Sequence, residues 1–223
     1  MLKRIAWQVV LATVVMASPA LAQDKRAEVS VLFGWTFADG VDGQAVPTER
    51  GIFDRLDPKD SFKWGLSVGF LTTENAEVGF MFGQQMTTLQ AGGTSTVDVG
   101  DMSISTYHGY FGYNFGDSDA KVRPYALIGL GATNYGGVDY TRLNGQPGTI
   151  GSETQFSTIW GAGVKFFASP SVGARFGIQW TPTYIKSDPG GTWCDPYWGG
   201  CYVVGDPQYS NQWDISGGIT FRF

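Results

Sequence analysis

Apolar and polar residues alternate along the last eleven residues of the chain, 213–223. Reading back from the end of the sequence, one alternate set is apolar or Gly: Phe223, Phe221, Ile219, Gly217, Ile215 and Trp213. The intervening set is polar or small: Arg222, Thr220, Gly218, Ser216 and Asp214. Alternation with a period of two predicts an extended strand with one apolar and one polar face. A face this aromatic at the very end of a strand favours contact with lipid over contact with water.

Seven earlier segments show the same alternation, with Gly, Ser, Thr and a few charged residues opposite the apolar set. The pattern predicts eight strands of roughly ten residues. They span 28–37, 62–71, 76–85, 103–115, 122–133, 156–166, 172–184 and 213–223. The predicted fold is therefore all-β: an eight-stranded antiparallel transmembrane β-barrel with up-and-down meander connections.

The connections between these strands alternate in length. Those after the second, fourth and sixth strands are short, at 72–75, 116–121 and 168–171. The other four are long, at 38–60, 86–101, 134–153 and 186–208. Short turns at one rim and long loops at the other are typical of outer-membrane barrels, with the long loops outside the cell. Such a barrel must close on itself, because lipid cannot satisfy an open strand edge.

The first 22 residues have the pattern of a secretory signal peptide. Lys3 and Arg4 precede a short apolar run, and Ala20-Leu21-Ala22 is a small-x-small cleavage site. We expect residues 23–223 to form one barrel domain. No later stretch approaches 18 consecutive apolar residues, which excludes a transmembrane helix beyond this segment.

The composition agrees with a barrel and narrows the function. The chain of 223 residues has 32 glycines, 15% aromatic and only 16% charged residues, and recurring Gly and aromatic residues are cues for barrel architectures. Its formal net charge of −5 argues against a nucleic-acid partner.

Together with the signal peptide and the eight strands, Arg123-Pro124-Tyr125 and the terminal Gly218–Phe223 resemble the small outer-membrane β-barrel family. That family includes the transmembrane domain of outer membrane protein A and the Ail, opacity and outer membrane protein W relatives. The resemblance implies a location in the outer membrane, surrounded by its lipid. It also implies that the barrel-assembly machinery recognises Phe221 and Phe223 as a C-terminal signal. We expect a monomer, and the resemblance implies no specific function.

Eight charged side chains are predicted to face the lumen: Glu28, Lys63, Glu77, Arg123, Lys165, Arg175, Asp214 and Arg222. An eight-stranded barrel is only wide enough for its own side chains, so these charges should pair with one another. The first and last strands close the barrel, which should make Glu28 and Arg222 neighbours. The network is interpreted as a structural plug, with a gate for small ions as the alternative; the surplus of Arg and Lys would favour anions.

The last long loop has the most distinctive sequence. Cys194 and Cys201 are the only cysteines of an exported chain, which predicts a disulfide. The aromatic residues Trp193, Tyr197 and Trp198 in and beside this predicted staple are candidates for contact with a partner. The alternative is a self-packed cap over the barrel mouth.

The sequence offers no constellation for an enzyme, a cofactor or a metal. His108 is the only histidine, predicted to face inward, with no base or nucleophile recognisable beside it. Asp39 and Asp42 open an acidic first loop whose spacing matches no EF-hand, so a solvated loop is expected. The predicted role is non-enzymatic: structural, or surface interaction through the long loops. The alternatives are a narrow channel for small solutes or ions and, third, a lipid-modifying enzyme.

Overall fold

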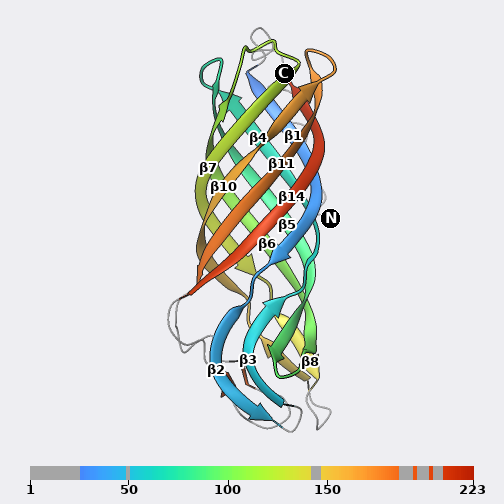
Figure 1. Cartoon of the computed structure of the whole chain (residues 1–223), viewed down its shortest axis with the longest axis vertical. Helices are drawn as coiled ribbons and strands as arrows, with labels where there is room; N and C mark the ends of the chain where they lie inside the picture. The colour runs from blue at the N-terminus through green and yellow to red at the C-terminus, as the bar shows by residue number, and fades with distance from the viewer. Residues whose placement is uncertain (1–25, 49–50, 142–146, 186–192, 195–200, 203–207) are drawn as a thin grey trace, which may run out of the picture.

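The computed structural model describes residues 26–48, 51–141, 147–185, 193–194, 201–202 and 208–223 (Figure 1). Side chains are described for 26–42, 54–139, 147–185 and 208–223. The predicted signal peptide, residues 1–22, lies outside the described residues. In the described part of the chain, no helix is long and apolar enough to cross a membrane.

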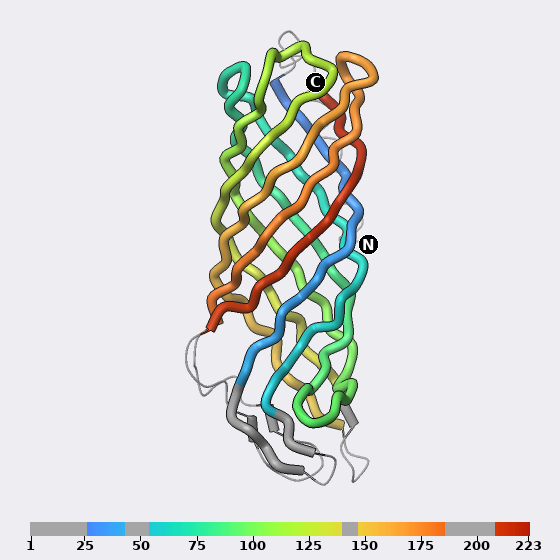
Figure 2. Tube along the Cα trace, viewed as in Figure 1, coloured from blue at the N-terminus to red at the C-terminus, as the bar shows by residue number. Residues whose placement is uncertain are grey.

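Eight long strands close into a tilted antiparallel barrel, which Figure 2 shows as a continuous tube. They are β1 (Ala27–Ala38), β4 (Ser61–Leu71), β5 (Ala76–Gly93), β6 (Val97–Asn114), β7 (Val122–Tyr135), β10 (Glu153–Phe167), β11 (Val172–Ile185) and β14 (Gln208–Arg222). Each pairs with its neighbours along the chain, and β1 also pairs with β14. In that closing pair Glu28 lies opposite Arg222. The predicted all-β, eight-stranded meander is confirmed.

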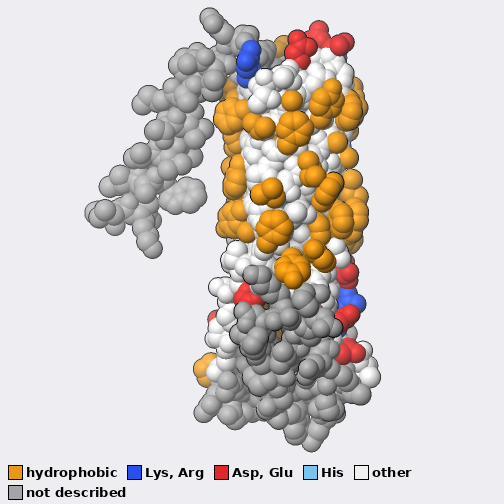
Figure 3. Space-filling model, turned by 90° about the vertical axis from the view of Figure 1, so that its left-hand side faces the viewer, with side chains coloured by type: hydrophobic (Ala, Val, Ile, Leu, Met, Phe, Trp, Pro, Cys, Tyr) orange, Lys and Arg blue, Asp and Glu red, His pale blue; other side chains and the backbone are white. Residues whose placement is uncertain are grey.

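Alternate residues of each strand point outward and form an apolar belt around the barrel (Figure 3). Phe33, Phe80 and Ile215 are about half exposed, while Ser30 and Thr220 on the opposite face are almost fully buried. A continuous apolar surface of this kind is a lipid-facing surface, because a water-soluble protein rarely exposes one. The predicted inward and outward faces hold on all eight strands, including the fifth.

The strands β5 and β6 continue well past this belt, so the prediction of a loop at 86–101 is wrong. Both strands are 18 residues long, and their ladder reaches Ala91 and Val97. Only residues 94–96 lie between them. Along the extension the buried set contains Leu89, Met102 and Ile104, whereas the outward set is mostly polar. The alternation keeps its period, but its apolar side turns from the outside to the inside.

The other long connections also contain strands rather than irregular loops alone. The first connection forms a hairpin of β2 (Val41–Thr48) and β3 (Gly51–Pro58), and β3 pairs with the extension of β5. The third contains the hairpin of β8 (Val138–Thr141) and β9 (Pro147–Ile150). The fourth contains the short pair β12 (Trp193–Cys194) and β13 (Cys201–Tyr202). We call β2, β3, β8, β9 and the extensions of β5 and β6 the head.

The opposite rim is built from the three short connections, as predicted. The Thr73 hydroxyl accepts hydrogen bonds from the backbone amides of Asn75 (3.3 Å) and Ala76 (2.9 Å). Ser169 caps the third turn in the same way. Gly116 opens the second turn with a φ of 86°, a left-handed conformation that favours glycine. These side-chain caps stabilise tight turns at this end of the barrel.

Candidate functional site

The lumen next to the short-turn rim holds an ion-pair network between two facing walls. Arg123 on β7, Lys165 on β10 and Arg175 on β11 lie side by side in the strand register. The acids stand on the facing strands: Glu28 on β1 and Glu77 on β5. The Lys165 ammonium bridges them, with an ion pair to Glu28 and a second to Glu77 at 2.7 Å. All five side chains are almost fully buried, so the bridge crosses the lumen and closes it.

Arg222 joins this network at the seam where the barrel closes. Its Nη2 lies 2.7 Å from Glu28 Oε1, the pairing expected from adjacent first and last strands. Its Nη1 donates to the backbone carbonyl of Ser118 at 3.2 Å, and its guanidinium stacks over the Phe167 ring at 3.9 Å. This contact ties the seam to the second short turn.

Arg123 and Arg175 are less completely paired. Arg123 donates from Nη2 to the carbonyl of Glu74 at 2.8 Å, while its Nε and Nη1 are buried and have no protein partner. Arg175 stacks over the Tyr125 ring at 4.4 Å and has a weak contact with Ser67. The six buried charges at this end are four cations and two acids, which leaves a surplus of positive charge.

An apolar layer fills the lumen next to the charge network. It consists of Met81, Tyr110, Tyr125, Leu127 and Ile159, all buried. Tyr110 carries its hydroxyl to Glu77 Oε1 at 2.6 Å, so the layer and the network are joined. The neighbouring strands make room for these rings with glycine: a Cβ on Gly177 would meet the Tyr125 hydroxyl at 2.3 Å. Two successive layers of packed side chains therefore occupy the barrel interior.

The remaining two predicted lumen charges form a separate pair nearer the head. Lys63 Nζ lies 2.6 Å from Asp214 Oδ2, and Thr36 donates to the other carboxylate oxygen. The structure thus brings together six of the eight predicted charges in one network and sets Lys63 and Asp214 apart from it. Buried polar atoms without a protein partner are also found in this part of the lumen, on Gln85, Thr181 and Gln212.

His108 has a hydrogen-bond partner that was not predicted from the sequence. Its Nε2 lies 2.9 Å from the Ser157 hydroxyl, and Thr133 and Thr183 continue the chain of hydroxyl groups. Both His108 and Ser157 lie opposite Gly131 in the strand pairings, so the imidazole reaches across the glycine strand. Ser157 was on the predicted inward face, but two strands separated by a third cannot be paired from alternation alone.

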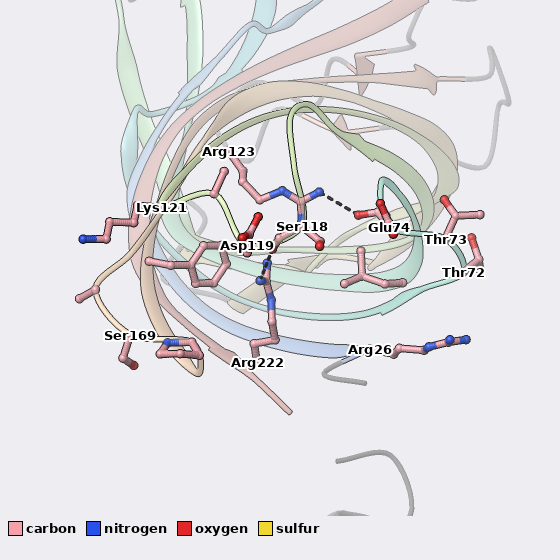
Figure 4. Close-up of a pocket in the computed structure, with 15 residues that line it drawn as sticks. Arg26, Thr72, Thr73, Glu74, Ser118, Asp119, Lys121, Arg123, Ser169 and Arg222 are labelled. Carbon is pink, nitrogen blue, oxygen red and sulfur yellow. Dashed lines mark hydrogen bonds between the residues drawn. The ribbon is translucent and has the colours of Figure 1, made fainter. Parts of the chain in front are cut away.

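The short-turn rim surrounds a cavity of about 870 Å³ (Figure 4). Six charged side chains line it, four of them cationic: Arg26, Lys121, Arg123, Arg222, Glu74 and Asp119. Figure 4 shows Arg123 and Arg222 entering from opposite sides, each held by a backbone carbonyl.

The head has an apolar interior of its own. Leu89, Met102, Ile104 and Val138 are buried, with Leu56, Val99, Tyr135 and Ile150 packed against them. A second cavity, of about 430 Å³, opens beside this core between β2, β3, β8 and β9. Asp39, at the start of the first connection, pairs with Arg55 on β3, so the acidic loop is part of a folded hairpin.

For the predicted disulfide site in the last long loop, only the backbone at residues 193–194 and 201–202 is described. Cys194 and Cys201 are partners in the two-residue ladder of β12 and β13, and Trp193 pairs with Tyr202. The disulfide stays a prediction. Tyr197 and Trp198 lie outside the described residues. At the other end of the barrel, Phe221 and Phe223 point outward and are about 40% exposed, and their role as an assembly signal also stays a prediction.

Several solved structures of outer-membrane proteins share this architecture. OprG from Pseudomonas aeruginosa matches with a TM-score of 0.61 and 10% identity, over 88% of this chain and 95% of OprG. Neisserial surface protein A matches with a TM-score of 0.53 and 14% identity, over 88% and 97%. The outer membrane protein AlkL gives 0.51 and 13%, over 89% and 90%. At these identities the likeness shows the fold. No curated protein matches the sequence.

The family comparison extends over nearly the whole sequence. The model of the outer membrane protein beta-barrel domain matches residues 9–221, which include all eight barrel strands and the head between them. The closed barrel, its apolar belt and this match lead to the same assignment. The chain belongs to the outer membrane protein beta-barrel domain family and is a protein of the outer membrane.

Proposed function

We propose that this barrel is a non-enzymatic, non-conducting membrane anchor whose extracellular head presents a surface to an external partner. The single observation that carries the proposal is the contrast along the barrel axis. Side chains fill the membrane-spanning part, while the strands continue beyond the lipid belt into a head with a separate apolar core and a cavity of about 430 Å³.

The filled lumen supports the non-conducting part of the proposal against the alternative of a narrow channel. An ion would have to part the buried bridge of Lys165 with Glu28 and Glu77 and then pass the layer of Met81 and Tyr125. Moving an ion through an apolar layer of this kind carries a large desolvation cost. We therefore expect no steady single-channel current across a planar bilayer.

The position of the His108–Ser157 pair supports the non-enzymatic part. Their exposed fractions are 1% and 0%, and they lie in the lumen among Thr133 and Thr183. A lipid-modifying site must be reached from the membrane, whereas this pair faces the interior. The pair is better explained as a buried hydrogen-bond chain than as a general base with its nucleophile.

The head supports the interaction part. Its first hairpin is held at both ends: Lys59, just after β3, donates to Asp98 on the extension of β6, and Gln208 on the barrel strand β14 accepts from the Asp42 amide at 3.0 Å. A partner surface built on paired strands loses less conformational entropy on binding than one built on free loops. The fourth connection, which carries the predicted aromatic anchors, starts and ends at the same end of the barrel, because Ile185 at the end of β11 pairs with Gln208 at the start of β14.

The test combines conductance with adhesion. Purified barrel should give no steady conductance in planar bilayers, and a steady single-channel current altered by Lys165→Gln would overturn the non-conducting assignment. Cells that display the barrel should adhere to surfaces coated with extracellular-matrix protein, and paired Cys194→Ser and Cys201→Ser changes should weaken that adhesion. Ser118→Ala, on a short turn at the opposite rim, is the matched control and should leave adhesion unchanged. Equal adhesion by cells that lack the barrel would contradict the platform.

A further inference from the structure

We propose that the cavity at the short-turn mouth is a binding site for a small oxyanion, such as phosphate, with Arg123 as its principal ligand. This end of an outer-membrane barrel faces the periplasm. The site lies at the opposite end of the barrel from the head and does not depend on any role of the head.

The buried network carries an excess of positive charge. Arg123, Lys165, Arg175 and Arg222 are each at most 8% exposed, and so are their acidic partners Glu28 and Glu77. The two carboxylates are shared between Lys165, Arg222 and Tyr110. Four cations against two anions leave two positive charges without a buried counter-charge. Buried charge is costly unless it is compensated, so this end of the lumen attracts an anion.

The hydrogen bonding of Arg123 within the protein is incomplete. Its guanidinium is held in place through Nη2 by the Glu74 carbonyl, but Nε and Nη1 are buried and have no protein partner. Nε and Nη1 lie on different edges of the guanidinium, so each offers a separate charge-assisted hydrogen bond to an oxygen of a phosphate or carboxylate. Buried N–H groups of a charged side chain are rarely left unsatisfied, and a ligand in the adjoining cavity would satisfy them.

Arg123 also lines the cavity at the short-turn mouth. The cavity volume of about 870 Å³ accommodates a hydrated phosphate, and Arg222 and Lys121 line it together with Arg123 (Figure 4). Thr72, Thr73 and Ser118 add hydroxyl groups to the lining. A mouth with hydroxyl donors and several cations has the chemistry of an oxyanion site.

Three acids lie close to the site and oppose anion binding. Glu74 and Asp119 line the cavity, and Asp117 interacts electrostatically with Arg123. All three are exposed on the turns. Their charges are screened by water and salt, whereas the buried Arg123 is screened much less. The buried cations therefore dominate the field inside the cavity.

The experiment uses the folded barrel in a neutral detergent without phosphate. Sodium phosphate and sodium chloride are compared at equal ionic strength, by thermal unfolding and by calorimetric titration. Phosphate should raise the melting temperature, and Arg123→Gln should weaken phosphate binding by about tenfold or more. Lys59→Gln removes an exposed cation at the opposite end of the molecule, and this variant should bind phosphate nearly as the unchanged barrel does. Equal melting temperatures in the two salts, or equal phosphate binding by Arg123→Gln, would overturn the proposal.

A second variant covers the case in which Arg123→Gln does not fold, as judged by the gel shift of unheated samples. Ala120→Glu places a carboxylate on the turn that lines the cavity, and it should compete with phosphate and weaken its binding. Undiminished phosphate binding by Ala120→Glu would count against the site.

A final arm identifies the source of the anion. The phosphate titration is repeated with the barrel in lipid nanodiscs that contain phosphatidylglycerol. A phosphate response that disappears there assigns the site to lipid headgroups, and one that persists assigns it to the free ion.

Discussion

The membrane-spanning part of β5 and β6 and the part that enters the head have the same alternation with opposite polarity. In the membrane part Phe80 and Phe111 point outward and are half exposed, while Glu77 and His108 are buried inside. In the head the inward positions are apolar: Leu89 is 8% exposed and Ile104 is 1% exposed. The same two strands change their surroundings without any break in the ladder except one register shift, between Leu89 and Gln90.

The difference follows from what lies outside the sheet. Lipid accepts apolar side chains, so a strand inside the membrane can place its polar residues in a narrow lumen where they pair with one another. Beyond the membrane the outside is water, and the hydrophobic effect drives apolar residues inward. Stability in the membrane part therefore depends largely on polar pairing inside the barrel, beside one apolar layer, and stability in the head depends on apolar packing.

The largest expected effect is the loss of the lysine that bridges the two acids. Lys165→Ala leaves Glu28 and Glu77 buried without their shared counter-charge, and the free energy of unfolding should fall by about 3–5 kcal/mol. Guanidinium unfolding in lipid vesicles, followed by tryptophan fluorescence, measures this change. Lys121→Ala, at an exposed position of a short turn, should cost almost nothing. If Lys165→Ala lowers the free energy of unfolding no more than the control does, the network does not stabilise the membrane part.

The next effect separates the head from the barrel. Ile104 is packed in the head core, and Ile104→Ala should destabilise the head by about 2–5 kcal/mol through lost burial and the cavity left behind. Hydrogen exchange should show lower protection at Leu89 and Met102 but unchanged protection at Phe80. Ile219→Ala is the control, because Ile219 points outward and is half exposed. Equal loss of protection in head and barrel would mean that the two regions unfold as one unit.

The sequence was sufficient to predict the barrel because one pattern repeats on all eight strands: apolar residues point outward, and mostly small or polar residues point inward. It also placed the charged residues in the lumen, since an inward position follows from alternation alone. The head was missed because its strands obey the opposite polarity. Residues 86–101 contain an alternating set, Thr87, Leu89 and Ala91, but its apolar members continue the inward face, where the membrane pattern leads one to expect polar residues.

Contacts across the lumen could not be predicted. The bridge from Lys165 to Glu77 joins two strands that are not neighbours, and it depends on strand tilt and stagger. The contact of His108 with Ser157 depends in the same way on how three strands are staggered. Only Glu28 and Arg222 were predictable as a pair, because barrel closure makes their two strands neighbours.

A smaller effect concerns the boundary between the two regions. The rings of Trp180 and Trp213 stack at 5.8 Å, and Trp180 donates from Nε1 to Asn211 at 3.1 Å. Trp213→Leu removes the stacking and should lower the free energy of unfolding by about 0.5–1.5 kcal/mol beyond the lost area. Unfolding in vesicles measures the change, with Ile215→Leu on the same outward face as the volume-conserving control. An effect no larger than that of the control would show that the stacking of Trp180 and Trp213 does not contribute to stability.

The smallest effect is a pH dependence at the surface of the head. A hydrogen bond from Gln90, and then the ammonium of Lys59, hold the pKa of Asp98 below its ordinary range. The folded head therefore gains from ionised Asp98 above the ordinary aspartate pKa of about 3.9, and it loses this gain as the pH falls through the lower folded value. Titration of the Asp98 carboxyl by NMR should give a midpoint below about 3.9 that rises in Gln90→Ala. Because Asp98 is exposed, solvent screens the interaction and the effect on stability should be small. A midpoint that is the same with and without Gln90 would show that the outward polar face of the head contributes only solubility.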